Sequence, residues 1–405
     1  MASHSRRSFL TAAGAAAVAA TAVGCTDGGG DEATSPSEGE QQGLLFPFRG
    51  DHQAGVTAPP SASGLVAGLD VRAKDRAELA EFLARLGEST EMVMSGRDYE
   101  DRAGGYPPLD TGILGAEPGP TGTSVVIGFG HSLFDQRFGL GDQLPNELQP
   151  MPKFFNDYLV RRETSGGDLS ITVSADTQEA TAHAFRQIMR ETRGDLVPRW
   201  SREGFNHIRP DHRPGVAPGR NLLGFKDGTS NPDPADAARM RELVWIDEND
   251  GQPDWAVGGT YQAIRVIRMM VEFWDRTRLN EQEALIGRHR DSGAPLGYTD
   301  EEDTPVFDTI ESHISRANPR TDEARRNELL RRGFNYVGGF DQNDQLDQGL
   351  IFVSYQRSLE NGFIATQRRL DGEALEEYIR PLTGGFFFVP PPPPEGEPFG
   401  AALLG

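Results

Sequence analysis

The pattern of hydrophobic and polar residues in the first half of the chain predicts a unit of strands and helices. Short apolar or alternating segments predict strands, and apolar residues spaced three and four positions apart predict helices. Strands are expected at 65–71, 124–129 and 169–173, and helices at 75–86 and 177–190. The order strand, helix, strand, strand, helix is typical of a ferredoxin-like α+β unit.

The second half repeats this theme, although no repeat of individual residues is visible. Strands are expected at 260–273 and 350–355, and helices at 280–290, 356–369 and 372–379. We therefore predict an α+β protein of two tandem ferredoxin-like domains, residues 44–205 and 206–390. The proline-rich residues 391–405 are expected to form a tail that adds nothing to the core.

The first residues have the features of an export signal. Arg6 and Arg7 precede an apolar stretch of small residues that ends near Gly24. This stretch is too short to span a bilayer, and the adjacent arginines indicate the twin-arginine form of signal. We expect residues 1–25 to direct export, and the protein to act in the periplasm, outside the cell or on the outer face of a membrane.

Two interpretations of Cys25 remain open. The sequence Ala-Val-Gly-Cys that ends at Cys25 resembles the processing site of a lipoprotein, and a diacylated cysteine would anchor the chain to a membrane. The alternative is an ordinary cleavage site that contains a cysteine. Residues 26–43 are mostly Gly, Ser, Asp and Glu, a composition typical of a flexible linker.

Composition excludes several kinds of site. The net charge is −21, and loss of residues 1–25, which hold two arginines and no acid, makes it two units more negative. A basic face for nucleic acid is therefore not expected. Cys25 is the only cysteine, so the mature body has no disulfide, no cysteine-ligated metal and no covalent attachment of haem through Cys-x-x-Cys-His.

Two segments of the second half contain residue types that suit catalysis. The Gly-x-x-Asp-Gly turn at 224–228 places glycines on both sides of Asp227, which allows close approach of the backbone. The segment Glu-Ser-His-Ile-Ser-Arg-Ala-Asn-Pro-Arg at 311–320 contains His313, and Leu-Arg-Arg-Gly follows at 330–333. Taken singly, such a turn is usually a surface turn, and a lone histidine is usually structural.

Together, and in this order, these segments resemble the dye-decolorising peroxidase family. The resemblance covers about residues 45–390, and it is closest to the twin-arginine-exported subfamily described as deferrochelatase/peroxidases. It implies that Asp227 is the distal aspartate and that His313 is the axial ligand of the haem iron. It also implies that Arg331, rather than the arginine that follows it, is the distal arginine.

The resemblance further implies a haem b held non-covalently in the C-terminal half. Gly228 and Arg331 would lie beside this haem, and either Arg265 or Arg268, on a strand that borders it, would pair with a propionate, with Arg265 as the preferred residue. For these two arginines the alternative is a strand with polar residues on one face. The implied substrates are H2O2 and small or bulky aromatic reductants.

The expected function is therefore a haem peroxidase that oxidises aromatic compounds by one-electron steps. An alternative from another class is a haem-binding protein for iron acquisition, with incidental peroxidase activity. A chlorite-dismutase-like protein is a weaker alternative, because Asp227 in its turn has no place there. Iron-uptake partners and a homo-oligomer are left open.

Overall fold

The computed structural model describes residues 44–100, 104–115, 119–207 and 219–405. The expected export signal, Cys25 and the expected linker lie outside these residues. Within the described part of the chain, no helix is both long enough and apolar enough to cross a membrane.

The first half forms a ferredoxin-like βαββαβ unit. Its elements are β1 (Ser63–Val71), α1 (Arg76–Met94), β2 (Ser124–Gly130), β3 (Leu169–Ala175), α2 (Gln178–Glu191) and β4 (Leu196–Phe205). The antiparallel strands follow the order β2-β3-β1-β4. The side chains of Asp75 and Thr177 accept hydrogen bonds from backbone amides of the first turns of α1 and α2, and so cap both helices. The sequence does not predict strand β4, because only its first residue is buried and the strand therefore has no apolar pattern.

The second half repeats the unit. Its strands are β5 (Thr260–Met269), β6 (Leu330–Arg331), β7 (Phe334–Phe340), β8 (Leu346–Gln356) and β9 (Ile379–Val389). Its helices are α3 (Ala237–Leu243), α4 (Val271–Trp274), α5 (Leu279–Ile286), α6 (His313–Ala317), α7 (Asp322–Arg326) and α8 (Ala365–Leu370), and α9 (Ala401–Leu404) ends the chain. Strands β9, β5, β8 and β7 are neighbours in that order, as in the first unit. The predicted α+β fold of two ferredoxin-like units is confirmed.

Some predicted boundaries in the second half are wrong. The strand expected at 260–273 ends at Met269, where the chain turns into α4. The helix expected at 372–379 is only a 3-10 turn, Ala374–Glu377, because Ile379 already pairs with Met269 as the first residue of β9.

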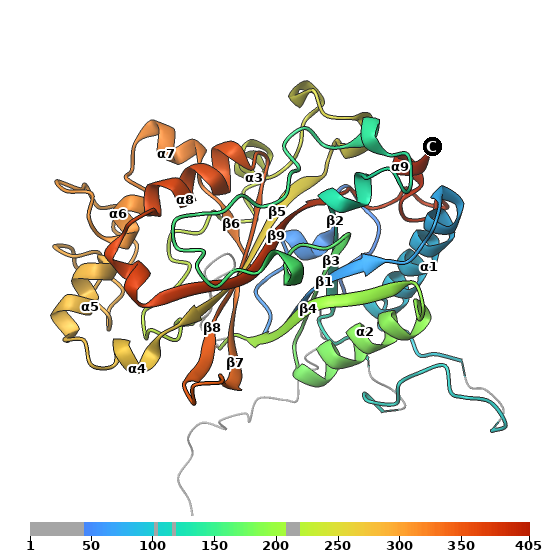
Figure 1. The fold of residues 1–405 in the computed structure, drawn as a ribbon, viewed down its shortest axis with the longest axis horizontal. Helices are drawn as coiled ribbons and strands as arrows, with labels where there is room; N and C mark the ends of the chain where they lie inside the picture. Colours follow the sequence, from blue (N-terminus) through green and yellow to red (C-terminus); the bar gives the residue numbers. More distant parts are fainter. Residues whose placement is uncertain (1–43, 101–103, 116–118, 208–218) are drawn as a thin grey trace, which may run out of the picture. The chain divides into compact units, whose positions relative to one another are not determined.

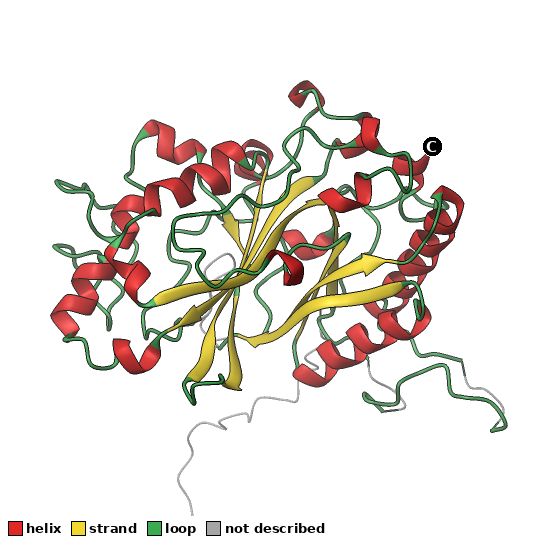
Figure 2. Ribbon diagram, in the orientation of Figure 1, coloured by secondary structure: helices red, strands yellow, loops and turns green. Residues whose placement is uncertain are grey.

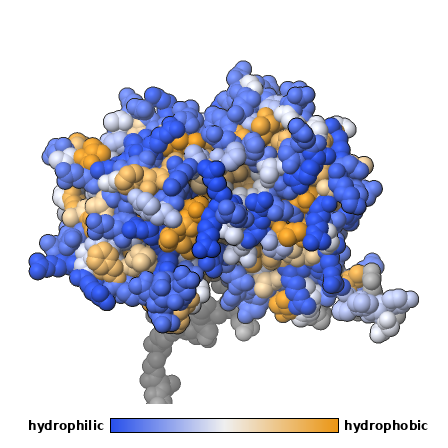
Figure 3. Space-filling model, viewed as in Figure 1, coloured by the Kyte–Doolittle hydropathy of each residue, from blue (hydrophilic) through white to orange (hydrophobic). Residues whose placement is uncertain are grey.

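The two four-stranded sheets join at both edges, so that their strands close into a ring. Strand β2 pairs with β9 at Phe129↔Phe388, and β4 pairs with β7 at Phe205↔Asn335. Strand β6 continues the line of β7 along β8. Figures 1 and 2 show the strands in the centre, with α1 and α2 beside the first unit and α4 to α8 beside the second. The face drawn in Figure 3 is mainly hydrophilic, with separate small apolar patches.

The expectation that residues 391–405 lie outside the core is wrong. Phe399 and Leu403 are only 3% and 2% exposed. The ring of Phe399 lies 5.7 Å from that of Phe129, and its Cβ covers Gly87 of α1. Burial of these two side chains gives the segment after the prolines a fixed place against the first unit.

Phe399→Ala should therefore destabilise the fold by about 3–5 kcal/mol, because a buried aromatic ring is lost and leaves a cavity. Urea unfolding of the mature protein measures the change. Glu395→Ala, an exposed position of the same segment, is the matched control and should leave the midpoint unchanged. Equal midpoints for both variants would show that the C-terminal segment is no part of the core.

Candidate active site

The structure brings all five predicted site residues to one cavity of about 270 Å³ in the second unit. Asp227, Gly228, Arg265, His313 and Arg331 line it. Much of the remaining wall is apolar, and its apolar side chains include Leu223, Phe225, Ile267, Ile286, Leu350, Phe352 and Leu375. An apolar cleft with a few convergent polar groups is typical of a ligand or cofactor site. We call it the Asp227 cavity.

The pair Asp227 and Arg331 is formed by docking of the glycine-rich turn on β6. Arg331 Nη1 donates to Asp227 Oδ1 at 3.1 Å. Beside it, the backbone N–H of Arg331 donates to Asn231 Oδ1 at 2.8 Å, and Asn231 Nδ2 donates to Arg331 O at 3.2 Å. The side-chain amide of Asn231 thus bonds to β6 much as a neighbouring strand would. The next arginine, Arg332, instead donates to the carbonyls of residues 56 and 57.

The turn itself needs glycine. Gly224 and Gly228 have φ angles of 89° and 86°, in the left-handed region that other residues rarely adopt. Glu301 also holds the turn in place. Its carboxylate accepts a hydrogen bond from Thr229 Oγ1 at 2.9 Å and forms an ion pair with Lys226 Nζ. Asp227 is therefore held at a fixed position on the cavity wall.

His313 is oriented by a buried carboxylate. Its Nδ1 lies 2.8 Å from Glu373 Oε2, and Glu373 is only 4% exposed. Burial is the largest influence on the imidazole and opposes its charged form, but the charge and hydrogen bond of Glu373 together outweigh it and raise the pKa of His313. With Nδ1 engaged, Nε2 is the nitrogen available to a metal ion.

Two arginines that the sequence did not single out also line the cavity. Among the described residues, Arg288 and Arg320 form no ion pair with a carboxylate, and both donate to Ser230 Oγ. The buried Nε of Arg320 has no partner within the described chain, and its backbone φ is 62°. Burial lowers the pKa of both guanidinium groups. This part of the wall is therefore suited to the carboxylates of an anionic ligand.

Arg265 reaches the cavity from β5 but is engaged with protein groups. It forms a buried ion pair with Asp157, and its Nη1 donates to Gln367 Oε1 at 3.0 Å. Its neighbour on the strand, Arg268, pairs with Asp341 at 2.6 Å. A contact between Arg265 and a ligand carboxylate stays a prediction.

No sequence signal pointed to Glu373 or Asn231 as functional residues. Glu373 follows His313 by 60 residues and Asn231 precedes Arg331 by 100, so only the fold reveals these contacts. Arg320 ends the segment 311–320 that contains His313, but nothing in the sequence assigned it a role, and Arg288 resembles an ordinary surface arginine.

Both the sequence and the fold are similar to those of known proteins. Family models of the Dyp-type peroxidase, N-terminal and C-terminal, match residues 53–206 and 218–393. A deferrochelatase from Escherichia coli strain K12 is 42% identical over 368 residues, which is 88% of this chain and 87% of that protein. The structure of ferric DtpA from Streptomyces lividans matches with a TM-score of 0.79 and 34% identity, over 90% of this chain and 98% of that one. A DyP-type peroxidase from Cellulomonas bogoriensis matches with a TM-score of 0.77 and 33% identity, over 90% and 99%.

Glu373→Gln should lower the pKa of His313, because the substitution removes the carboxylate that raises it and leaves the effect of burial. A raised pKa in the folded state means that the His313–Glu373 contact stabilises the haem-free fold fully below about pH 6.5, and that this stabilisation is lost as pH rises through the folded pKa. NMR titration of the histidine ring nitrogens in the haem-free protein measures the shift. An unchanged titration in the variant would contradict the role assigned to Glu373.

Proposed function

The chain belongs to the Dyp-type peroxidase family, and we propose that it is a haem peroxidase that uses H2O2 to oxidise aromatic reductants by one-electron steps. The observation that carries the proposal is the meeting, in one cavity, of the pair Asp227–Arg331 with an imidazole held by Glu373. Within this family a mobile proton, a fixed positive charge and an iron ligand are the parts that peroxide cleavage requires.

The residues of the cavity fit a non-covalently held haem b. Nε2 of His313 would ligate the iron, and the apolar wall suits the porphyrin plane. The cationic Arg288 and Arg320, including the unpartnered Nε of Arg320, suit the propionates. The absence of cysteine after Cys25 leaves no thiolate ligand or thioether link. When bound, the haem iron supplies the redox centre at which the peroxide O–O bond is broken.

Asp227 and Arg331 would have separate roles in the cleavage of peroxide. Asp227 Oδ1 accepts from Arg331, which leaves Oδ2 to take a proton from the near peroxide oxygen and return it to the far one. The guanidinium of Arg331 carries a permanent charge and stabilises the oxygen that departs with the electron pair. Overall, one H2O2 and two molecules of a phenol yield two waters and two phenoxyl radicals.

A second function has a specific observation in its favour, which is the 42% identity with proteins named deferrochelatase. In that case the cavity would capture haem for iron acquisition, and turnover of peroxide would be incidental. Haem capture depends on His313, the apolar wall and the arginines, whereas peroxide cleavage depends in addition on Asp227 and Arg331. Substitution of this last pair therefore separates the two functions.

Asp227→Asn and Arg331→Leu should each slow the reaction with H2O2 by roughly 100-fold or more while haem affinity stays within a few-fold. Stopped-flow absorption at the Soret band after mixing with peroxide measures the first quantity, and haem titration measures the second. Asp291→Asn, at a side chain that is 90% exposed, is the control and should behave as wild type. A wild-type Soret band that does not respond to peroxide would favour haem capture instead.

We also propose that residues 1–25 direct export by the twin-arginine route, so that the peroxidase acts outside the cytoplasm or on the outer face of a membrane. The adjacent Arg6 and Arg7 ahead of a short apolar stretch support this location.

Replacing Arg6 and Arg7 with lysine should accordingly abolish export, because the twin-arginine signal depends on the arginine side chains themselves. Cell fractionation and immunoblotting of the full chain measure the result. In the same assay Cys25→Ser should release the exported protein from membranes if the cysteine is diacylated. Normal export of the double-lysine variant would exclude this route.

A further inference from the structure

A short segment ahead of β1 connects the first unit to the strand that carries Arg331. It comprises residues 52–57, with the sequence His-Gln-Ala-Gly-Val-Thr, and contains one 3-10 turn, Ala54–Val56. We call this segment the strap. None of its residues lines the Asp227 cavity, so the reaction described above gives the strap no role.

Gln53 fixes the strap at the seam between β2 and β9. These strands pair at Phe129↔Phe388. The same register, continued by two residues, places Ile127 opposite Pro390, which has no N–H with which to pair. The buried amide of Gln53 lies there instead. Its Oε1 accepts from Ile127 N at 2.8 Å, and its Nε2 donates to the carbonyl oxygens of Ile127 and Pro390, each at 3.0 Å. Gln53 therefore bridges the two units at this end of the seam.

The residues on either side of Gln53 limit movement of the strap. The ring of His52 is stacked on that of Trp245 with 3.7 Å between the ring centroids, and His52 Nδ1 lies 2.7 Å from Gly258 O. Gly55 lies so close to β2 that a Cβ atom there would come within 2.7 Å of Val126 Cγ2. The strap is thus in close contact with both units.

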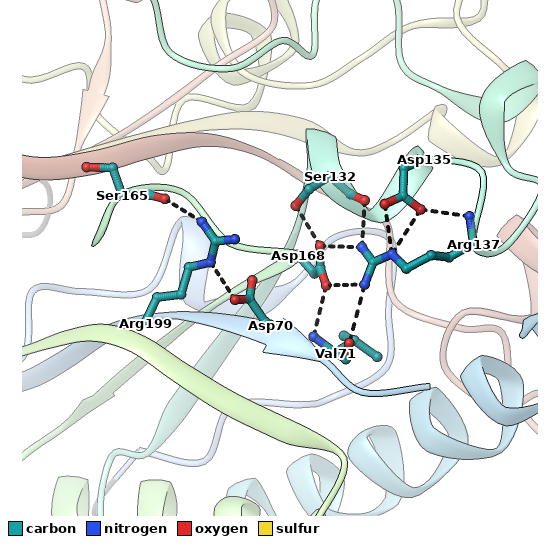
Figure 4. Close-up of polar contacts among 8 residues, drawn as sticks. All are labelled: Asp70, Val71, Ser132, Asp135, Arg137, Ser165, Asp168 and Arg199. Atoms are coloured by element: carbon teal, nitrogen blue, oxygen red, sulfur yellow. Dashed lines mark hydrogen bonds and ion pairs between the residues drawn. The ribbon is translucent and has the colours of Figure 1, made fainter. Parts of the chain in front are cut away.

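Strand β2, against which the strap packs, is itself fixed within the first unit by a polar network at its far end (Figure 4). Gly130 N donates to Asp168 O at 2.8 Å. The carboxylate of Asp168, a residue only 2% exposed, accepts from Val71 N at 2.9 Å and from Ser132 Oγ at 2.6 Å. Both terminal nitrogens of Arg137 also donate to it. These contacts tie the end of β2 to β1, so the strap rests on a strand of fixed position.

The end of the strap bonds to Arg332, which directly follows Arg331. Arg332 Nε donates to Val56 O at 3.2 Å, and Nη2 donates to Thr57 O at 3.1 Å. Its backbone N–H donates to Val353 O of β8 at 2.8 Å. Burial lowers the pKa of Arg332 to about 10, so the guanidinium is still charged at neutral pH. Among the described residues it forms no ion pair with a carboxylate, and the two strap carbonyls are its hydrogen-bond partners.

The direction of one arginine limits that of the other. Adjacent residues of an extended chain direct their side chains to different sides, so a rotation of the chain moves both. Strand β6 has only two residues, Leu330–Arg331, and a ladder of two pairs with β8 restricts such a rotation less than a long ladder does. A rotation that took Arg332 away from the strap carbonyls would also turn Arg331 away from Asp227.

We propose that Arg332 and Gln53 are positioning residues of the peroxidase reaction. Gln53 holds the strap at the seam, the strap holds Arg332, and Arg332 sets the direction of the Arg331 guanidinium that faces Asp227. Neither Gln53 nor Arg332 lines the Asp227 cavity. The effect on turnover rests on the proposed peroxidase function, whereas the effect on the position of Arg331 does not.

Fluoride tests the position of Arg331 without peroxide, because a guanidinium beside the open face of the haem iron stabilises an anion bound there. Arg332→Met should weaken fluoride binding to the haem-loaded protein roughly fivefold or more, as followed in its absorption spectrum. Arg190→Met is the matched control, because Arg190 also donates to two backbone carbonyls, those of Pro108 and Asp110, and does not line the cavity. It should stay within about twofold of wild type.

Stopped-flow absorption after mixing with H2O2 tests the effect on the reaction. Arg332→Met should slow the Soret response roughly tenfold, with haem affinity within about twofold of wild type. In a chain that already carries Arg331→Leu, the same substitution should change the rate by less than about twofold, because a positioning residue acts only through the group it positions. Gln53→Ala leaves the second unit unchanged and should act in the same direction as Arg332→Met, and it carries the test if Arg332→Met does not fold.

Three results would overturn the proposal. The first is wild-type fluoride affinity and peroxide rate in Arg332→Met and Gln53→Ala, and the second is equal slowing by Arg332→Met with and without Arg331→Leu. The third is full recovery in Arg332→Lys, which keeps the charge but loses the fork that spans two carbonyls. Failure of the peroxidase function would appear separately, as a wild-type Soret band that ignores peroxide, and the fluoride titration would still test the position of Arg331.

Discussion

The hydrogen bonds between the side-chain amide of Asn231 and the backbone of Arg331 are the contact on which the active site depends. At 2.8 and 3.2 Å they dock the glycine-rich turn on β6, and the 3.1 Å contact of Asp227 with Arg331 follows from this docking. Strand β6 is in turn fixed by its pairing with β8, and β8 by its pairing with β5. The relative position of Asp227 and Arg331 thus depends on the closed ring of strands.

His313, in another part of the cavity wall, is positioned by a side-chain contact rather than by strand pairing. His313 opens a short helix, and its ring direction is set by Glu373, which comes from the chain just after α8. Arg288 and Arg320 of the cavity wall have no carboxylate partner among the described residues, which suits a flat cofactor that carries its own negative charges. In a protein of net charge −21, two arginines without an ion-pair partner among the described residues mark the Asp227 cavity as suited to an anionic ligand.

Sequence patterns predict what depends on local periodicity or on a shared motif. The apolar spacing of α1 and the alternation of β3 are visible in the chain, and the resemblance to a family brought Asp227, His313 and Arg331 together. Strand β4 shows no clear apolar pattern, because only its first residue is buried and backbone pairing with β1 along its whole length sets its position.

Other features depend on contacts between distant segments. Phe399 follows a run of prolines that indicates a tail, yet it is buried against α1. Glu373, Asn231 and the two unpaired arginines of the cavity become functional candidates only when the fold places them beside residues 58 to 100 positions away.

Stopped-flow absorption of the haem-loaded Asn231→Ala variant after mixing with H2O2 tests most directly whether docking of the glycine-rich turn on β6 builds the pair Asp227–Arg331. Asn231 touches neither peroxide nor haem in the mechanism proposed, and acts only by positioning the turn that carries Asp227. We expect the variant to bind haem with unchanged affinity and to show a Soret response at least tenfold slower than wild type, with a correspondingly altered pH profile. A wild-type rate and pH profile would contradict the claim that docking of the turn on β6 builds the catalytic pair.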